Sequence, residues 1–291
     1  MNSRFNSFLL VGSLGVGGVL AAQVPPNQPA VRVVDSQRKE PIPYASVGVP
    51  NKPLGTVADA HGTFSLSQIG AAPSDTLVIS CVGFQAQKLT VRDLGQQSEI
   101  RLAPQAQTLA EVVVHGGQPR RAIIGHNWVS AFTSYGFYTT ADTVPHARLG
   151  REIGVLLHVK HPALVENFHL FTSGRDFKSV TFRLNIYAVE NGQPRHSLLR
   201  QDVVFTVNGQ GRGWTDVDLR PFAITLAGQQ QVVATVEWLS SEAGRAGGKF
   251  LDIPTHLSAV HTTYSRSKSA QDWTTYGSNP SMYFDVLNYP D

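Results

Sequence analysis

The sequence contains one cysteine in 291 residues, so no internal disulfide can form and apolar cores alone must hold the fold together. Charge is scarce as well: Asp, Glu, Lys and Arg make up 15%, against the roughly 25% usual for soluble proteins, and the net charge is only +3. No basic run concentrates that surplus, and phosphate binding needs a clustered positive surface. Nucleic acid is therefore excluded as a partner, and the composition resembles that of extracellular proteins.

The amino terminus predicts an export signal over residues 1–22. Arg4 precedes an apolar stretch, Phe8–Leu20, which ends at the small residues Ala21 and Ala22. The alternative is a membrane anchor, but about 13 apolar residues fall short of the ~20 that a spanning helix needs. No cysteine follows the stretch, which excludes a lipoprotein anchor. We therefore expect a secreted protein whose mature chain has no transmembrane segment.

The remaining length favours two domains at roughly 100–200 residues each. The first, residues 30–103, shows seven short segments of strand type with turn residues between them, which predicts a β-sandwich. Within it, Gly55–Leu66 predicts a hairpin turning at Asp59 and Gly62, where aspartate can cap the turn and glycine can adopt a positive φ. Cys81 lies in the apolar run Leu77–Val82, which predicts a buried and inert thiol.

Three segments of this domain carry a family resemblance: Pro41–Ser46, Gly55–Phe64 and Ile79–Phe84. They resemble the carboxypeptidase-regulatory-like domain, a transthyretin-like Greek-key sandwich common in envelope proteins of Bacteroidetes. The following segment, Leu109–Val114, is similar to the one that often trails this domain. The resemblance implies a non-catalytic domain of carbohydrate-binding-like fold, located in the periplasm, in the outer membrane or on the surface of a Gram-negative cell, with sugar binding as an analogy only.

The sequence speaks against two activities found beside such domains. A zinc carboxypeptidase needs a His and a Glu three residues apart, and none of the ten histidines has Glu at the third following position. A TonB-dependent receptor would need a plug domain and a membrane barrel of many strands, and these cannot fit in the residues that remain. Neither a Gly-x-Ser-x-Gly element nor a phosphate-binding loop is present outside the predicted signal. We therefore expect no enzyme and no cofactor.

Residues 104–126 contain proline, a Gly-Gly pair and Arg120-Arg121, and we expect a linker there, with Val112–Val114 able to add as an edge strand. The second domain, residues 127–287, shows eight segments of strand type, which predicts a jelly-roll sandwich. Its clearest alternation lies in Phe182–Tyr187. The expected strands are Glu152–Val159, Asn167–Thr172, Ser179–Val189, Leu199–Val207, Trp214–Leu219, Gln231–Trp238, Leu257–Tyr264 and Ser281–Leu287.

This half is similar to a jelly-roll module of unknown function that follows the same regulatory-like domain in Bacteroidetes proteins. The similarity rests on Phe182–Tyr187, Gly213–Leu219 and Val236–Trp238, which we interpret as framework.

Sugars are bound by exposed aromatic rings beside carboxylates and amides. Trp273 and Tyr276, with Asp272 and Asn279, fit this pattern best, and they are the candidate ligand-binding residues. The alternative is that Trp273 packs over the sandwich edge as a plug. For two other tryptophans, Trp214 and Trp238, core or rim packing is the favoured interpretation.

Metal binding has weaker support. His158, His161, His169, His256 and His261 lie on separate segments, and no paired cysteine or His-Glu element accompanies them, so we expect no metal site from them. A structural calcium ion would need the carboxylates of Asp216, Asp218 and Asp252 together with loop carbonyls that sequence cannot reveal.

The sequence thus predicts a secreted or envelope module of two β-sandwiches that binds carbohydrate or envelope polymer without catalysis. The alternative is a structural or protein-interaction accessory of the outer membrane or cell surface with no small ligand. An unrecognised hydrolase would need a constellation assembled from distant loops. Exposure of Trp273 and Tyr276 beside a polar groove would favour sugar, and burial of both would favour the structural role.

Overall fold

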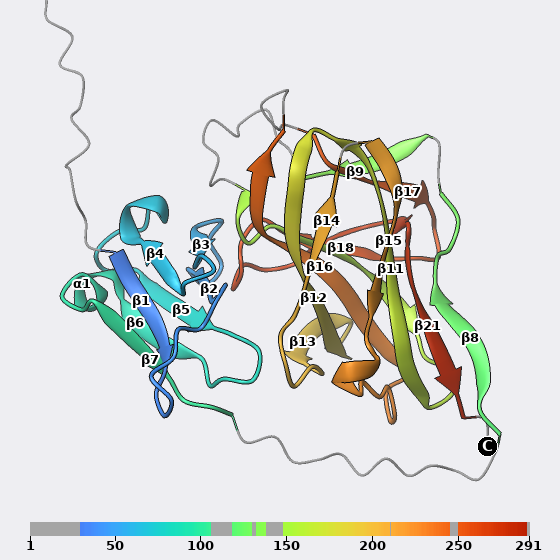
Figure 1. Ribbon diagram of the computed structural model, residues 1–291, viewed down its shortest axis with the longest axis horizontal. Helices are drawn as coiled ribbons and strands as arrows, with labels where there is room; N and C mark the ends of the chain where they lie inside the picture. The colour runs from blue at the N-terminus through green and yellow to red at the C-terminus, as the bar shows by residue number, and fades with distance from the viewer. Residues whose placement is uncertain are drawn as a thin grey trace, which may run out of the picture.

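The computed structural model describes residues 30–105, 118–129, 132–137, 148–209, 211–244 and 250–289. Within them two domains lie side by side, a small one and a larger one, both built from strands (Figure 1). The all-β prediction is therefore confirmed. No helix in these described ranges is long and apolar enough to cross a membrane. The predicted signal, residues 1–22, and the predicted edge strand, Val112–Val114, lie outside the described residues.

The first domain contains the seven short strands that the sequence predicts, in two sheets with the orders β4-β1-β7 and β3-β2-β5-β6. β1 and β7 pair in parallel, and the other pairs are antiparallel. Apolar side chains between the sheets are fully buried, among them Val33, Val47, Leu77 and Ile100. The elements are β1 Ala30–Asp35, β2 Ser46–Gly48, β3 Gly55–Val57, β4 Thr63–Ser65, η1 Leu66–Gln68, β5 Thr76–Ser80, β6 Gln87–Thr90, α1 Val91–Leu94 and β7 Glu99–Leu102.

The predicted hairpin between β3 and β4 is wrong, although its turn chemistry is right. Asp59 Oδ1 accepts from the backbone amides of His61 at 2.8 Å and Thr63 at 2.9 Å, and Gly62 has φ +71°. However, β3 pairs with β2 while β4 pairs with β1, so the turn carries the chain from one sheet to the other. Turn residues fix the local bend, but not the partner of each strand.

The second domain is a sandwich of two larger sheets. One contains the order β15-β11-β21-β8 and the other the order β10-β16-β12-β14, with all pairs antiparallel. The chain crosses between the sheets repeatedly, for example from β10 to β11, from β11 to β12 and from β14 to β15. The elements are β8 Arg120–Gly125, β9 Thr133–Gly136, β10 Glu152–His158, β11 Ala163–Arg175, β12 Phe177–Glu190, β13 Gln193–Ser197, β14 Val203–Asn208, β15 Gly211–Asp218, η3 Arg220–Phe222, β16 Gln231–Ala243, β17 Asp252–Leu257, β18 Thr263–Arg266, β19 Thr274–Tyr276, β20 Ser278–Pro280 and β21 Met282–Asn288.

Two boundaries differ from the sequence prediction. β8 lies inside the predicted linker 104–126, yet it pairs with β21 over six residues and is a strand of the second sandwich. The predicted strand 257–264 does not exist, because β17 ends at Leu257 and β18 starts at Thr263 in the opposite sheet. Only one of the six residues of β8 and two of the eight residues 257–264 are buried, so their apolar pattern was too weak to locate the strand ends.

The core of the sandwich contains the large side chains that the alternating strands direct inward. Trp238 is 1% exposed and contacts the rings of Phe177, Phe182 and Phe137, in agreement with its predicted core position. Trp214 is partly buried on β15, where its ring packs edge-on against Phe171 and Tyr283.

The two domains touch through β2 and the loops beside it. The backbone amide of Asn51 donates to the carbonyl of Ala270 at 3.2 Å. Gly48 lies so close to the backbone of Ser269 that a Cβ atom added to Gly48 would lie 1.9 Å from the carbonyl oxygen of Ser269. A backbone contact of this kind fixes the position of the small domain over the outer face of the β10-β16-β12-β14 sheet.

The turn at Gly62 provides a test of the crossing between sheets. A Cβ at Gly62 would lie 2.8 Å from the carbonyl oxygen of Val33 and 2.9 Å from that of Ile42, whereas Gly70, with almost the same positive φ, has open space around it. We expect Gly62→Ala to lower the free energy of unfolding by about 2–4 kcal/mol and Gly70→Ala by about 1 kcal/mol, because only the first adds a steric clash to the backbone strain. Urea unfolding measures both, and equal losses would contradict the crowded turn.

Candidate functional site

The site begins with the alternation in β12. Phe182, Leu184 and Ile186 belong to the sandwich core, and Arg183, Asn185 and Tyr187 make their contacts on the opposite face. On that outer face the register of four neighbouring strands aligns one residue from each. In this alignment, Arg183 of β12 lies opposite Glu237 of β16, Glu237 opposite Glu152 of β10, and Glu152 opposite Arg266 of β18. We call these four residues the charged row.

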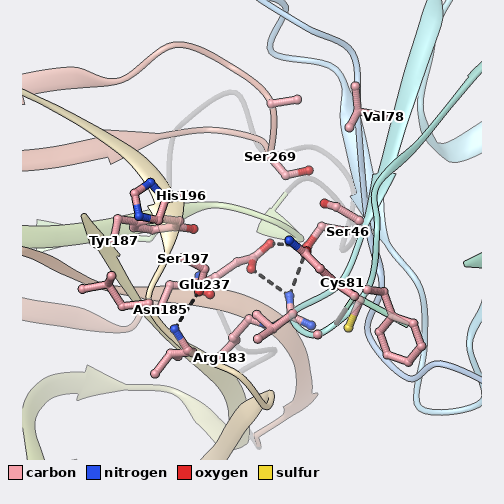
Figure 2. A pocket seen from close by; sticks show the side chains of 18 of the residues that line it. Ser46, Val78, Cys81, Arg183, Asn185, Tyr187, His196, Ser197, Glu237 and Ser269 are labelled. Carbon is pink, nitrogen blue, oxygen red and sulfur yellow. Dashed lines mark hydrogen bonds and ion pairs between the residues drawn. The ribbon is translucent and has the colours of Figure 1, made fainter. Parts of the chain in front are cut away.

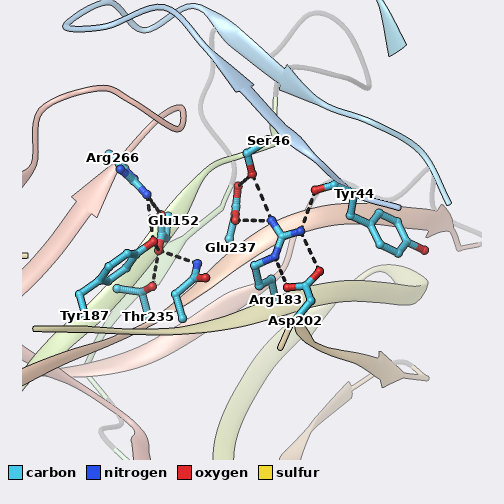
Figure 3. A network of polar contacts seen from close by, with 10 residues as sticks. Tyr44, Ser46, Glu152, Arg183, Tyr187, Asp202, Thr235, Glu237 and Arg266 are labelled. Atoms are coloured by element: carbon cyan, nitrogen blue, oxygen red, sulfur yellow. Dashed lines mark hydrogen bonds and ion pairs between the residues drawn. The ribbon is translucent and has the colours of Figure 1, made fainter. Parts of the chain in front are cut away.

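Arg183 connects one end of the charged row to the first domain (Figure 3). Its guanidinium donates to Glu237 Oε2 at 2.9 Å, to Asp202 Oδ1 and Oδ2 at 2.5 and 3.0 Å, and to the backbone carbonyl of Tyr44 at 2.7 Å. Ser46 Oγ donates to Glu237 Oε1 at 2.9 Å and accepts from Arg183 at 3.1 Å. Arg183 and Glu237 are each only 3% exposed at the side chain. Ser46 of β2, in the first domain, thus packs on the ion pair and helps to exclude it from solvent.

Glu152 organises the other end of the charged row. Its carboxylate is fully buried and accepts from Arg266 Nε at 2.7 Å, Asn185 Nδ2 at 2.9 Å and Tyr187 OH at 3.0 Å, as well as from the hydroxyl of Thr235. With four donors on one carboxylate, the desolvation of its charge is compensated.

The electrostatics favour the ionised forms of Arg183 and Glu237. Burial alone would raise the pKa of Glu237, but the cations Arg183 and Arg266 and the hydrogen bonds of Arg183 and Ser46 outweigh it, so the pKa lies below its usual value. Burial would lower the pKa of Arg183, and Asp202 and Glu237 raise it well above the normal range instead. Burial and then Glu152 raise the pKa of Tyr187, so its hydroxyl stays a neutral donor.

A cleft of about 800 Å³ opens beside the charged row, between the two domains (Figure 2). Its floor comes from the second domain and includes Arg183, Asn185, Tyr187 and Glu237, whose polar atoms are held by the contacts described above. The first domain supplies the facing wall through the end of β5 and the turn after it. Exposed side chains at the rim are Gln105, His196 and Arg200, and the ring of Phe84 is half-buried there.

Cys81 lies in the wall of this cleft, and its position differs in part from the prediction. The side chain is partly exposed instead of buried. Burial of the thiol nevertheless raises its pKa to about 12, against the opposing effect of Arg183. Because the thiolate is the nucleophile, this raised pKa disfavours reaction of the thiol at neutral pH.

The arrangement can donate and accept hydrogen bonds. Both carboxylates of the charged row already accept from internal donors, Glu237 from Arg183 and Ser46, and Glu152 from a guanidinium, an amide and two hydroxyls. Among the residues that the structure describes, no group of three His, Cys, Asp or Glu side chains is placed to hold a metal ion.

The four candidate residues from the sequence do not meet in one site. The guanidinium of Arg266 lies over the ring of Trp273, with Arg266 Cζ 4.2 Å from the ring centre. Trp273 also makes an edge contact with the ring of Tyr187. Tyr276 is 49% exposed on β19 and lines a smaller hollow, and Asp272 is exposed. Asn279 is buried on β20 in the other sheet. Trp273 therefore covers the charged row, as in the alternative that treats it as a plug.

The residues considered for metals are engaged separately. His169 is hydrogen-bonded to Asp216 at 2.6 Å and to Asp285 at 2.9 Å, while Asp218 pairs with Arg220 at 2.8 Å. Asp252 lies on another strand, and its pKa is raised by burial and by the nearby carboxylate of Asp176. The three aspartates of the calcium hypothesis are thus divided between different contacts.

Sequence reasoning missed the charged row. Arg183 and Glu237 were interpreted as framework, because a polar face of a strand is normally a solvated face. The signal that could have located them is the charged residue Glu237 between Val236 and Trp238 in an otherwise apolar strand, since such a position is seldom charged without a partner.

A comparison with protein families agrees with the resemblance found in the sequence. Residues 32–114 match the model of the CarboxypepD_reg-like domain. Such a domain is typically non-catalytic, which suggests a binding or regulatory role for this part of the chain. The search of curated proteins finds no match for the chain.

The Arg183–Glu237 pair can be tested by a double-mutant cycle. Glu237→Leu leaves a buried guanidinium with Asp202 as its one remaining carboxylate, and we expect a loss of about 3–5 kcal/mol in the free energy of unfolding. Adding Arg183→Met should recover a large part of that loss, because the uncompensated charge is gone. Lys178 and Glu242 form an exposed pair on the same two strands, so the cycle Lys178→Met with Glu242→Leu is the control, with changes within about 0.5 kcal/mol. Additive losses at Arg183 and Glu237 would contradict the pairing.

Proposed function

We propose that the protein is a non-catalytic binding module for a carbohydrate or envelope polymer, and that it acts outside the cytoplasm of a Gram-negative cell. The observation that supports this proposal is the interdomain cleft, because it combines a floor of fixed polar groups with a rim of polar, basic and aromatic side chains. Both domains contribute to its walls, so a ligand bound there would need the two domains together.

The chemistry of the cleft suits a saccharide. Ser197 and Gln105 offer neutral groups that both donate and accept, Arg200 offers a donor array, and the ring of Phe84 offers an apolar face for C–H groups. A ligand would meet polar groups whose positions are already held by the charged row. Such preorganisation favours binding, because little conformational entropy is lost at the site.

The second candidate is a structural or protein-interaction accessory with no small ligand. The packing of Trp273 on Arg266 supports this alternative, because it uses the most prominent candidate sugar-binding aromatic for internal contacts. Only the exposed ring of Tyr276 remains for a ligand at that loop.

A glycan-array screen with the chain 23–291 separates the two. We expect binding to a defined glycan class, reduced at least about tenfold by Gln105→Ala or Arg200→Ala at the rim of the cleft. Arg92→Ala is the matched control, since Arg92 is exposed on α1 away from the cleft. Trp273→Ala reports on the site first predicted from the sequence.

Loss of binding in Trp273→Ala, with the rim variants unchanged, would move the site to the loop 271–279. No binding to any glycan would favour the structural accessory.

A further inference from the structure

The turn between β17 and β18 presents apolar side chains to solvent. Val260 in the turn is 80% exposed, and Leu257 at the end of β17 is 69% exposed. The backbone of the turn is held in place. Ser258 Oγ accepts from the amides of Val260 at 3.3 Å and His261 at 3.2 Å, and the amide of Ser258 donates to the carbonyl of Gly277 at 3.1 Å. The two apolar side chains are therefore displayed by an ordered loop.

A half-exposed tryptophan extends this apolar surface. Trp128 is 50% exposed, and its ring packs on the rings of His126 and His256, with ring centres 4.2 and 4.8 Å apart. Successive side chains of a strand point to opposite faces, so Leu257 lies on the other side of β17 from His256 and Trp128. The end of β17 is thus a wedge with an apolar side chain on each side and Val260 in the turn beyond. We call Trp128, Leu257 and Val260 the apolar wedge.

The chain around the apolar wedge carries no formal charge. Residues 126–129, 255–264 and 274–281, which are joined by the contacts above and by the pairing of β17 with β20, contain no Asp, Glu, Lys or Arg. On one flank, His261 lines a hollow together with the exposed side chain of Lys160. The described residues of that lining include no aspartate or glutamate. A neutral apolar surface is therefore bordered by a cation and by no acidic group in this lining.

We propose that the apolar wedge inserts into the surface of an anionic lipid bilayer, with Lys160 among the headgroups. A folded protein partner would cover one side of the wedge, whereas a bilayer surrounds an inserted turn on all sides. A turn without charges enters the headgroup region without the cost of desolvating an ion, and tryptophan favours this depth. Lys160 would pair with the lipid phosphates. The inference goes beyond the proposed function, because no residue of the wedge lines the interdomain cleft.

The test is co-sedimentation of the chain 23–291 with lipid vesicles. One set contains phosphatidylcholine and phosphatidylglycerol in equal parts, and the other contains phosphatidylcholine alone. We expect binding to the anionic vesicles that is at least fivefold tighter than to the neutral ones and that weakens with added salt. Lipids with brominated acyl chains should quench the tryptophan fluorescence. Trp128→Phe should keep the binding and lose the quenching. No binding to either set, or binding without quenching, would overturn the proposal.

Variants with matched controls test the residues. Val260→Asp places a charge on the wedge and should weaken vesicle binding at least tenfold, while Val204→Asp makes the same change at an exposed valine on β14 and should have little effect. Equal losses in these two variants would show general charge repulsion only and would overturn the proposal. Lys160→Ala should weaken binding about fivefold, and Lys178→Ala, also exposed, is its control.

All these side chains are exposed, so we expect an unchanged Tm. If Val260→Asp lowers the Tm, Leu257→Ser decides in its place, and unchanged vesicle binding in Leu257→Ser would contradict insertion. A dimer in sedimentation velocity that Val260→Asp abolishes, without vesicle binding, would assign the wedge to a second copy of the chain and overturn the proposal. Glycan binding by Val260→Asp should equal that of the wild type, which distinguishes failure of this surface from failure of the proposed function.

Discussion

The arrangement of this protein depends on the buried ion pair of Arg183 and Glu237. Two charges inside a protein are stable only when all their hydrogen-bonding capacity is used, and here Asp202, Ser46 and the carbonyl of Tyr44 complete it. Tyr44 and Ser46 belong to the first domain, so the pair is satisfied only when the small sandwich is docked. The outer face of the larger sheet would otherwise expose these charges to water, and docking converts them into the polar floor of a cleft.

This interaction explains how two ordinary sandwiches form a site that neither contains alone. The charged row fixes the donors and acceptors of the floor, and the close backbone contact of Gly48 with Ser269 fixes the facing wall. Since each charge already has its partner, the cleft presents oriented hydrogen-bonding groups and no reactive carboxylate. Such a surface suits recognition of polar groups.

Much of the fold could be predicted from sequence, but the charged row could not. Alternation in short segments located the seven strands of the first domain and showed that Phe182 and Arg183 point to opposite faces of β12. Strand pairing and domain docking depend on contacts between residues far apart in the chain, which a local pattern does not contain. For this reason the link between β3 and β4 was mistaken for a hairpin, β8 was mistaken for a linker, and the polar face of β12 was mistaken for a solvated one.

The claim that the buried ion pair makes the two sandwiches one cooperative unit can be measured by differential scanning calorimetry of the chain 23–291 at neutral pH. The account predicts a single transition whose calorimetric enthalpy equals its van't Hoff enthalpy, as for one two-state unit that includes both domains. Two separate transitions, one for each sandwich, would contradict it.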